Sequence, residues 1–354
     1  MANPLIDSSL SNEQLVEISE KLGSGFRHVA ESGAIDVNPT PRRVVQRDDR
    51  ATLYRYGDAD GHAKGTPLLI VYALVNRPYM LDLEADRSII ANLVDEGVPV
   101  YLLDWGYPDA SDQFLTLGDY LFDYLEAAVT ASLRDADAPQ VDLMGVCQGG
   151  VFSLCYAAAR PSRVRNLVTM VTPVDFHTPD NLLSRWVRKL DVEAMVDTLG
   201  NVPGDLLNWT FLSLKPFMLG VGKYLEMIDN ADDAERLATF LRMEKWIHVS
   251  PDQAGAAFVE FVRTFFIENA LVEGPFMVGG ETISIDRITH PILNVIANRD
   301  HLVPPSASRP LAKLTASRDY TAHEEDAGHI GLFVGRQSSK SLAGTVARWL
   351  SEHA

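Results

Sequence analysis

Residues 141–160 read VDLMGVCQGGVFSLCYAAAR, and this stretch decides the expected fold. Its first four residues form an apolar run typical of a short buried strand, and the apolar residues after Gly150 indicate a helix. The turn between them has the spacing G-x-C-x-G, that of a nucleophile elbow with Cys147 where serine usually stands. Such a strand–turn–helix unit places its central residue above the C-terminal edge of a parallel sheet. We therefore expect Cys147 to be a nucleophile.

The alternative for this turn is structural, because cysteine is also common as a small buried residue. The strand–turn–helix context favours the nucleophile, since a helix N-terminus stabilises a thiolate. In such a turn the backbone N–H of Gln148 points into the oxyanion site. Cys155 lies further along the same expected helix, on the order of 12 Å away at about 1.5 Å per residue. That distance is too long for a disulfide, so we expect Cys155 to be a packing residue.

Short apolar runs alternate with amphipathic stretches along the chain. Besides 141–144, the runs that predict strands are 67–72, 98–103, 164–171 and 292–296. The stretches with helical patterns are 85–95, 117–135 and 149–160. Runs that are apolar on both faces are typical of parallel strands covered by helices. Together with the elbow, the alternation predicts an α/β-hydrolase fold, with a doubly wound, mostly parallel sheet.

The alternation divides the chain into four expected parts. Residues 1–40 form an N-terminal helical segment packed on the core, because Ser11 and Gln14 have capping-box spacing and apolar residues follow at helical intervals. The α/β core then runs in two parts, 41–175 and 289–354. Between them, 176–288 is expected to be an inserted, mostly helical cap. The alternative is a separate C-terminal domain, but the return to a strand near residue 292 favours the insertion.

A cysteine nucleophile needs a base, and the base needs an acid that orients it. In hydrolases of this type the order along the chain is nucleophile, acid, histidine. Asp300 follows the last predicted strand, and His329 lies in the later sequence AGHIG. His301 competes for the role of base, but an acid and a base adjacent in sequence usually point apart. We therefore expect His329 as general base, oriented by Asp300, with His301 near the site.

Other residues are expected around this triad. The loop after the strand at 67–72 supplies the second oxyanion N–H in this fold, which makes Val75 or a direct neighbour the candidate beside Gln148. The residues considered for supporting contacts or a substrate path are His301, Asn76, Asp104, Trp246 and His248. For Asp104 and His248 we favour structural or packing roles. The histidines show no metal-ligand spacing, and no metal is expected.

Composition limits the classes of function. The 354 residues include 31 Lys and Arg against 48 Asp and Glu, a formal net charge of -17. This balance opposes non-specific nucleic-acid binding but allows a small anionic substrate in a local basic pocket. Two cysteines cannot make a disulfide framework, which favours a reducing cytoplasm. We expect neither a signal peptide nor a transmembrane anchor.

The sequence around these residues resembles the polyhydroxyalkanoate synthases, specifically the catalytic subunit of the two-subunit class III enzymes. The stretches that carry the resemblance, from about residue 68 to residue 335, are LLIVYALVNRPYM, VYLLDWGYPD, GVCQGG, TMVTPVDF, LLNWTFLSLKP, FLRMEKWI, DHLVPP and GHIGLFVG. They continue through the expected cap, which a generic cysteine hydrolase would not match. The family's Cys, Asp and His fall on Cys147, Asp300 and His329.

The resemblance implies polymerisation of (R)-3-hydroxyacyl-CoA, chiefly 3-hydroxybutyryl-CoA, into an intracellular polyester with release of CoA through a covalent Cys147 acyl-enzyme. It implies no cofactor, because the CoA thioester is the substrate. A direct role for Asp300 as base is a rival within the family. The implied partners are the growing polyester chain and the class III partner subunit, in a homo- or hetero-oligomer. The implied location is cytoplasmic, on polyhydroxyalkanoate granules.

CoA is anionic, so its entrance should carry a local excess of positive charge. The candidates are Arg77, Lys215, Arg242 and Lys245, which the sequence does not rank. Two other functions stay open. A cysteine-dependent α/β-hydrolase, such as a thioesterase or depolymerase, would use the same triad with water as second nucleophile. A non-catalytic granule-associated protein would need no triad at all.

Overall fold

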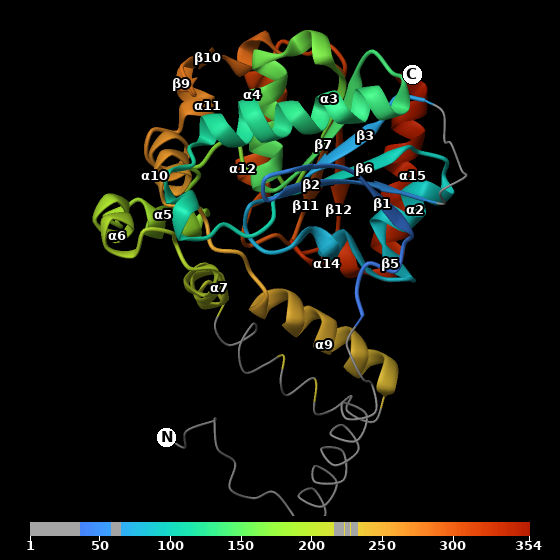
Figure 1. Cartoon of the computed structure of the whole chain (residues 1–354), viewed down its shortest axis with the longest axis horizontal. Helices are drawn as coiled ribbons and strands as arrows, with labels where there is room; N and C mark the ends of the chain where they lie inside the picture. Colours follow the sequence, from blue (N-terminus) through green and yellow to red (C-terminus); the bar gives the residue numbers. More distant parts are fainter. Residues whose placement is uncertain (1–35, 58–64, 216–222, 224–226, 228–232) are drawn as a thin grey trace, which may run out of the picture.

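The computed structural model describes residues 36–57, 65–215, 223, 227 and 233–354. The expected N-terminal helix around Ser11 lies outside the described residues. An eight-stranded sheet forms the centre of the molecule, in the order β1-β2-β6-β3-β7-β8-β11-β12 (Figure 1). Its strands are β1 (Arg42–Asp48), β2 (Ala51–Tyr56), β3 (Leu68–Val71), β6 (Val100–Asp104), β7 (Val141–Val146), β8 (Val164–Met170), β11 (Ile292–Ala297) and β12 (Tyr320–Glu325).

Most neighbouring strands of this sheet run parallel. Only the pairs β1–β2 and β2–β6 are antiparallel, and they form one edge. The pairs from β6 through β3, β7, β8 and β11 to β12 are all parallel. The predicted α/β-hydrolase fold with a mostly parallel sheet is therefore confirmed, and all five predicted strands are present with ends shifted by a few residues.

Three strands of the sheet were not predicted, and each lies at or next to an edge. β1 is largely exposed along its length, and β12 (YTAHEE) alternates between exposed and half-buried residues. β2 lies between β1 and β6 and carries polar residues, Thr52 and Arg55, among its apolar ones. Edge strands need no continuous apolar run, so the criterion that found the central strands misses them.

Helices cover both faces of the sheet, and strand periodicity decides which side chains they meet. Leu69 and Val71 of β3 pack in one apolar cluster with residues of α3 and α4, whereas Leu68 and Ile70 pack in a second cluster with α2 and α15. Side chains of successive strand residues point to opposite faces, so one short apolar strand contributes to both clusters. The helices are α2 (Ile89–Asp95), α3 (Leu125–Ala136), α4 (Gln148–Ala159), α12 (Pro305–Ser308), α13 (Leu311–Leu314), α14 (Gly331–Val334) and α15 (Arg336–Glu352).

One predicted helix begins later than its sequence pattern indicated. The expected helix at 85–95 starts only at Ile89, because Ser88 caps it by accepting a hydrogen bond from the N–H of Ala91. The residues before it form the hairpin β4 (Asp82–Glu84) and β5 (Arg87–Ser88). The stretch 117–135 is helical from Leu117, as predicted, and includes a π-helical segment, η3 (Asp119–Tyr124). The short 3-10 segments of the core are η1 (Pro78–Leu81), η2 (Ala110–Phe114) and η4 (Pro161–Arg163).

The turn between β7 and α4 has a backbone that depends on its glycines. Cys147 adopts φ 54 and ψ -119, a conformation that L-residues rarely occupy. A Cβ on Gly149 would lie 2.0 Å from the carbonyl oxygen of Val71, and one on Gly150 would lie 1.9 Å from Oγ1 of Thr172. The strand, the turn and the helix therefore approach more closely than any larger residue permits.

The region expected to be a cap divides into two portions. The first portion includes the helices α5 (Leu182–Val187), α6 (Val192–Leu199), α7 (Gly204–Ser213) and α9 (Ala234–His248). Helix α9 lies apart from the sheet, at the same end of the molecule as α7 (Figure 1). The portion from Ala254 to Ile288 packs in the same apolar cluster as the sheet. Its elements are α10 (Gly255–Phe261), η6 (Val262–Ile267), α11 (Ala270–Glu273), β9 (Phe276–Val278), β10 (Glu281–Ile283) and η7 (Ile285–Arg287).

Aromatic contacts explain why this second portion joins the core. The ring of Phe261 lies edge-on to Phe152 of α4 at 5.9 Å, and Phe265 stacks on Phe176 at 6.0 Å. The sequence pattern of this portion is helical and does not indicate which residues it contacts, so its packing on the sheet is shown only by the structure. Of the helices that the structure describes, none combines the length and the apolar composition that crossing a bilayer requires.

The elbow glycines give a stability prediction. Replacing Gly149 by Ala introduces a Cβ that clashes with the backbone of β3, so the free energy of unfolding should fall by about 3 kcal/mol. The control is Gly344→Ala in α15, where a Cβ meets nothing within 4 Å. That change should raise the free energy of unfolding by about 0.5–1 kcal/mol. Urea denaturation measures both; equal effects of the two changes would contradict the account of the turn.

Candidate active site

Cys147 stands at the head of α4, where helix and strand geometry hold it in place. Its backbone N–H donates to the carbonyl of Met170 in the adjacent strand β8, at 2.9 Å. Its side chain is half-buried, whereas Cys155 is completely buried in the apolar cluster that α3 and α4 form with one face of the sheet. Burial raises the pKa of the Cys155 thiol to about 12, which leaves it inert as a nucleophile. Only Cys147 is therefore placed for chemistry.

Asp300 lies just after β11 and is almost fully enclosed. Its Oδ1 accepts hydrogen bonds from the backbone N–H groups of Leu302 and Val303, at 2.8 and 2.9 Å. Its Oδ2 lies 2.6 Å from Nδ1 of His329. Since a carboxylate can only accept, Nδ1 carries the proton of this bond. Both oxygens are thus occupied, and the Asp300 side chain is fixed from two directions.

His329 connects Asp300 to the nucleophile. Burial lowers the pKa of His329, but the charge and the hydrogen bond of Asp300, together with contact with the Cys147 side chain, outweigh burial and raise it to about 10. Because Nδ1 faces Asp300, Nε2 is the atom left for Cys147. The structure therefore brings the three residues that the sequence singled out into one hydrogen-bonded chain.

His301 lies beside this chain and outside it. Burial lowers the pKa of His301, and the positive charges of Lys215 and His329 lower it further against the opposing effect of Asp300. The carboxylate of Asp300 is bonded to His329 rather than to its sequence neighbour. Asp300 is thus paired with His329, and His301 lies beside this pair with a lowered pKa.

Two backbone N–H groups close to Cys147 have no acceptor within the described part of the chain. One belongs to Gln148, the first residue of α4, where helical N–H groups lack a partner. The other belongs to Val75, in the loop after β3. The neighbours of Val75 are both bonded: the N–H of Leu74 donates to Oε1 of Gln148 at 3.0 Å, and the N–H of Asn76 donates to Oγ of Ser250 at 3.2 Å. This pattern suits an oxyanion site.

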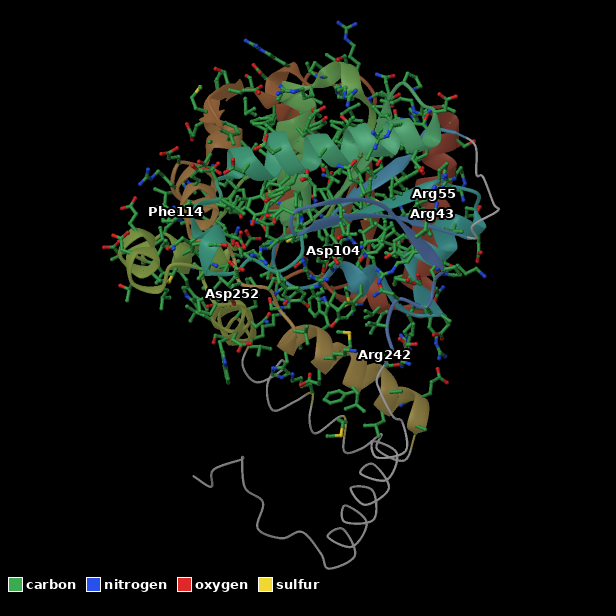
Figure 2. The ribbon with its side chains drawn as sticks, in the orientation of Figure 1. Arg43, Arg55, Asp104, Phe114, Arg242 and Asp252 are labelled. Atoms are coloured by element: carbon green, nitrogen blue, oxygen red, sulfur yellow. The ribbon has the colours of Figure 1, made fainter. Side chains whose placement is uncertain are left out.

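Asp104 supports the same loop from the end of β6. Its carboxylate accepts from the guanidinium of Arg77 at 2.6 Å and from the N–H of Gly106 at 3.0 Å. Arg77 also lies over the ring of Tyr107, 4.2 Å from its centroid. Figure 2 labels Asp104 near the middle of the molecule, as seen in that view. Its contacts are those of a residue that orients a loop.

The two candidates on α9 differ sharply. Trp246 is 6% exposed, and its Nε1–H donates to the carbonyl of Arg77 at 2.8 Å. The side chain of His248 is 66% exposed, and its nearest charged partner is Glu244 at 3.8 Å. Trp246 therefore contacts the loop beside the site, whereas His248 faces outward. A substrate path along either residue stays a prediction.

The candidate cations are also unequal. The guanidinium of Arg77 is paired with the carboxylate of Asp104. Arg242, on α9, is paired with Glu84 at 2.9 Å, and Figure 2 shows Arg242 well apart from Asp104. Lys215, just after α7, lies near enough to His301 to affect its titration and makes no ion pair with any described residue. Lys245 lies on α9. Of the four candidates, Lys215 is thus the one whose charge is seen to act on a residue beside the triad.

Sequence reasoning missed Ser250, which lies 174 positions from the residue it contacts, Asn76. No motif marks it, because its role depends on the cap folding back over the loop after β3. The described residues also hold no cluster of three His, Cys, Asp or Glu side chains that could bind a metal ion. The chemistry available on these residues is nucleophilic acyl transfer with general base assistance.

Comparison with known proteins agrees with this geometry. Residues 66–336 match the model of a family described as alpha/beta hydrolase fold. The chain is 49% identical over 342 residues to the poly(3-hydroxyalkanoate) polymerase subunit PhaC of Allochromatium vinosum, covering 96% of both chains. The corresponding protein of Synechocystis is 44% identical over 348 residues, covering 96% of this chain and 92% of the relative.

Among solved structures, a putative lipase from Sulfolobus solfataricus superposes with a TM-score of 0.55 at 13% identity, over 89% of this chain and 99% of that one. At that identity the likeness concerns the fold alone. The expected resemblance to the polyhydroxyalkanoate synthases is confirmed by the two sequence relatives.

The bond between Asp300 and His329 gives a titration prediction. In Asp300→Asn the opposing charge disappears, so burial dominates and the pKa of His329 should fall by at least about 1 unit from its raised value. Nitrogen-15 NMR of labelled histidine measures this pKa. The control is Asp326→Asn, which removes an exposed carboxylate paired with Arg299. A His329 pKa that is equal in the two variants would contradict the pairing.

Proposed function

The chain belongs to the poly(3-hydroxyalkanoate) polymerase subunits of the alpha/beta hydrolase fold, and on this premise we propose that it polymerises (R)-3-hydroxyacyl-CoA, chiefly 3-hydroxybutyryl-CoA, with release of CoA. One observation carries the proposal: Cys147, His329 and Asp300 form a continuous chain of contacts at the N-terminus of α4. The names of the relatives support an enzyme that transfers acyl groups to build a polyester.

The first half-reaction loads the enzyme. His329 accepts the thiol proton of Cys147, and the thiolate attacks the carbonyl carbon of the substrate thioester. The N–H groups of Val75 and Gln148 stabilise the negative oxygen that forms. The intermediate then expels the CoA thiolate, which takes the proton from His329, and Cys147 is left as an acyl thioester. One thioester is broken and one is made, so this step is nearly balanced in free energy.

The second half-reaction lengthens the chain. His329 removes the proton from a 3-hydroxyl group, either of another monomer or of a chain end, and the alkoxide attacks the acyl thioester. An ester bond forms, and the Cys147 thiolate leaves and recovers the proton from His329. Asp300 has both oxygens occupied, by two backbone N–H groups and by His329. This occupation supports the orienting role of Asp300 over its action as a direct base.

Water must be excluded from the acyl-enzyme, because hydrolysis would compete with the hydroxyl group. The helices α7 and α9 of the cap portion, with the contacts of Trp246 and Ser250 to the loop after β3, supply a shield over this side of the site. CoA and polymer need a path, so the shield must open during the cycle.

The remaining parts of the proposal concern partners. Lys215 is the favoured contact for the anionic CoA, since it adds positive charge next to His301 without a carboxylate partner among the described residues. A second, class III subunit is proposed to be needed for full activity, in a homo- or hetero-oligomer. Association with polyester granules in the cytoplasm would follow from the bound product chain. The CoA thioester is the substrate, and no further cofactor is proposed.

A cysteine-dependent hydrolase is the main alternative, since the fold and the triad would serve it equally well. A thioesterase or depolymerase would deliver water where the synthase delivers the 3-hydroxyl group. A non-catalytic granule-associated protein would have no reason to keep the pKa of His329 raised by Asp300 beside a half-buried cysteine. The products of the reaction separate these functions.

The nucleophile is tested by the two cysteines together. Cys147→Ala should abolish CoA release from 3-hydroxybutyryl-CoA, measured with a thiol reagent, because no acyl-enzyme can form. Cys155→Ala is the matched control: it removes the buried thiol that lies outside the site, so the rate should stay within about twofold, with a stability loss of about 1 kcal/mol.

The same assay, with a candidate partner subunit and without it, identifies the product. Insoluble polyester with equivalent CoA release is the expected result. CoA release from Cys147→Ala at the wild-type rate would overturn the assignment of the nucleophile. Free 3-hydroxybutyrate without polymer, in both assays, would replace the synthase by the hydrolase.

A further inference from the structure

The loop from Leu74 to Arg77, here called the oxyanion loop, is held from two sides by different parts of the molecule. From the elbow side, Oε1 of Gln148 accepts from the N–H of Leu74 at 3.0 Å. From the cap side, Oγ of Ser250 accepts from the N–H of Asn76 at 3.2 Å, and the indole N–H of Trp246 donates to the carbonyl of Arg77 at 2.8 Å. Within the loop the N–H groups of Val75 and Arg77 have no acceptor among the described residues, and that of Val75 lies between two bonded neighbours.

The oxyanion loop passes through a left-handed residue at Asn76. Asn76 has φ 60, in the left-handed region, and its side-chain oxygen is buried without a partner in the described part of the molecule. Asparagine tolerates this region better than most other non-glycine residues, and the bonds on either side of Asn76 hold the loop in this position. The direction of the Val75 N–H therefore depends on bonds made by Leu74, Asn76 and Arg77. Two of these three bonds come from the cap.

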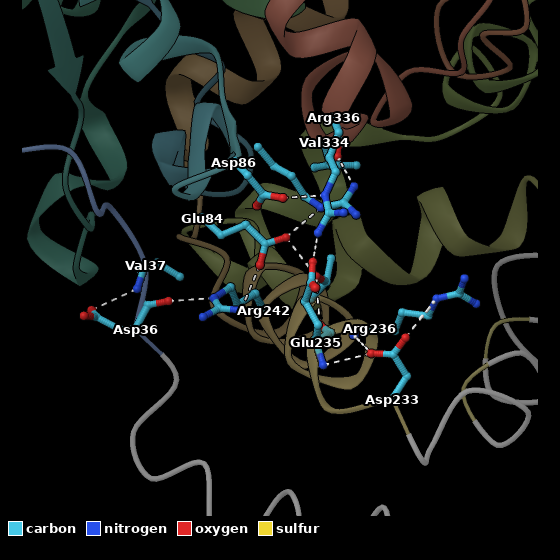
Figure 3. A network of polar contacts seen from close by, with 12 residues as sticks. Asp36, Val37, Glu84, Asp86, Asp233, Glu235, Arg236, Arg242, Val334 and Arg336 are labelled. Carbon is cyan, nitrogen blue, oxygen red and sulfur yellow. Dashed lines mark hydrogen bonds and ion pairs between the residues drawn. The ribbon is translucent and has the colours of Figure 1, made fainter.

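The helix that carries Trp246 is fixed to the core at its other end as well (Figure 3). Arg242 and Thr239 of α9 both bond to the carboxylate of Glu84, at 2.9 and 2.8 Å. Glu235 at the start of α9 forms an ion pair with Arg336, the first residue of α15. Glu84 ends β4, which follows the oxyanion loop through η1. Helix α9 thus lies along the whole segment that begins with the loop.

The segment after α9 connects the loop to the rest of the cap. Asp252 accepts from the N–H of Gly204 at 3.0 Å, at the start of α7, beside which Figure 2 labels it. A Cβ on Gly204 would lie 2.5 Å from the carbonyl oxygen of Ser250, so the two backbones are in close contact. A displacement of α7 or α9 must therefore move Ser250 or Trp246.

We propose that Trp246 and Ser250 are positioning residues that set the Val75 N–H in the oxyanion site, so that acylation of Cys147 requires the cap to be closed on the loop. Opening the cap for CoA or polymer breaks both hydrogen bonds and releases the second oxyanion donor. Oxyanion stabilisation requires donors held within about 3 Å of the developing charge, so a released donor contributes little. The inference rests on the proposed function to the extent that Cys147 must form an acyl-enzyme.

The test removes each bond with the smallest change of shape. Trp246→Phe deletes the indole N–H but keeps an apolar ring, and Ser250→Ala deletes the hydroxyl. The matched control for the first is Trp349→Phe, because Trp349 is 5% exposed against 6% for Trp246 and its Nε1 has no partner among the described residues. The control for the second is Ser213→Ala, whose exposed hydroxyl bonds only within α7.

Two reactions of Cys147 are compared in each protein. Acylation is followed as the burst of p-nitrophenol from p-nitrophenyl butyrate, which needs the oxyanion site but neither CoA nor polymer. Alkylation by iodoacetamide needs the same thiolate but forms no oxyanion. We expect the burst rate constant to fall about five- to tenfold in each variant, the effect of about one hydrogen bond, with alkylation within about twofold of wild type. The dependence of the burst on ester concentration should be unchanged, and both controls should behave as wild type.

Other results overturn the inference. Equal losses in the rates of acylation and alkylation would show that the two residues are merely structural. If Trp246→Phe needed a higher ester concentration but reached the wild-type maximal burst, Trp246 would instead line the substrate path. Unchanged bursts in both variants, with a wild type that acylates, would defeat the inference alone. A wild type that is alkylated at Cys147 but never acylated would defeat the proposed function and this inference with it.

Discussion

The left-handed backbone of Cys147 is the constraint on which the rest of the structure depends. At φ 54 the residue breaks the path from β7 into α4, and the break can close only because Gly149 and Gly150 let the helix approach Val71 and Thr172. The same geometry leaves the N–H of Gln148 without an acceptor among the residues that the structure describes, and it directs the side chain of Gln148 to the loop after β3. One strained residue therefore sets the nucleophile, one oxyanion donor and the support of the other.

Electrostatics then joins the elbow to the far end of the chain. Asp300 and His329 come from loops after β11 and β12, and their bond raises the pKa of His329 in spite of burial, which favours His329 as the acceptor of a proton. Burial alone would favour the neutral ring, as it does in His301 nearby. The pKa values of the two histidines are thus shifted in opposite directions, that of His329 raised by its carboxylate partner and that of His301 lowered by burial and by the charge of Lys215. In the proposed reaction this difference assigns proton transfer to His329 and leaves His301 to shape the surroundings.

Much of this arrangement could be predicted from the sequence, because it rests on local patterns. The central strands are short and apolar on both faces, and the elbow is a contiguous motif. The order of Cys147, Asp300 and His329 along the chain reflects the order of the strands. The edge strands β1 and β12 lack such patterns since solvent reaches many of their side chains, and β2 beside β1 interrupts its apolar residues with polar ones. The role of Ser250 could not be predicted, because it depends on one hydrogen bond to a residue 174 positions away. The packing of Phe261 and Phe265 on the core escaped for the same reason: a helical pattern does not say what it packs against.

The central claim is that Cys147 carries the acyl group during turnover. The most direct measurement is peptide mass spectrometry of the enzyme quenched in acid while it consumes 3-hydroxybutyryl-CoA. The account predicts that the peptide containing Cys147 gains the mass of one or more 3-hydroxybutyryl units, that hydroxylamine removes them, and that the peptide containing Cys155 stays unmodified. Steady turnover with an unmodified Cys147 peptide, or with the acyl group on another residue, would contradict it.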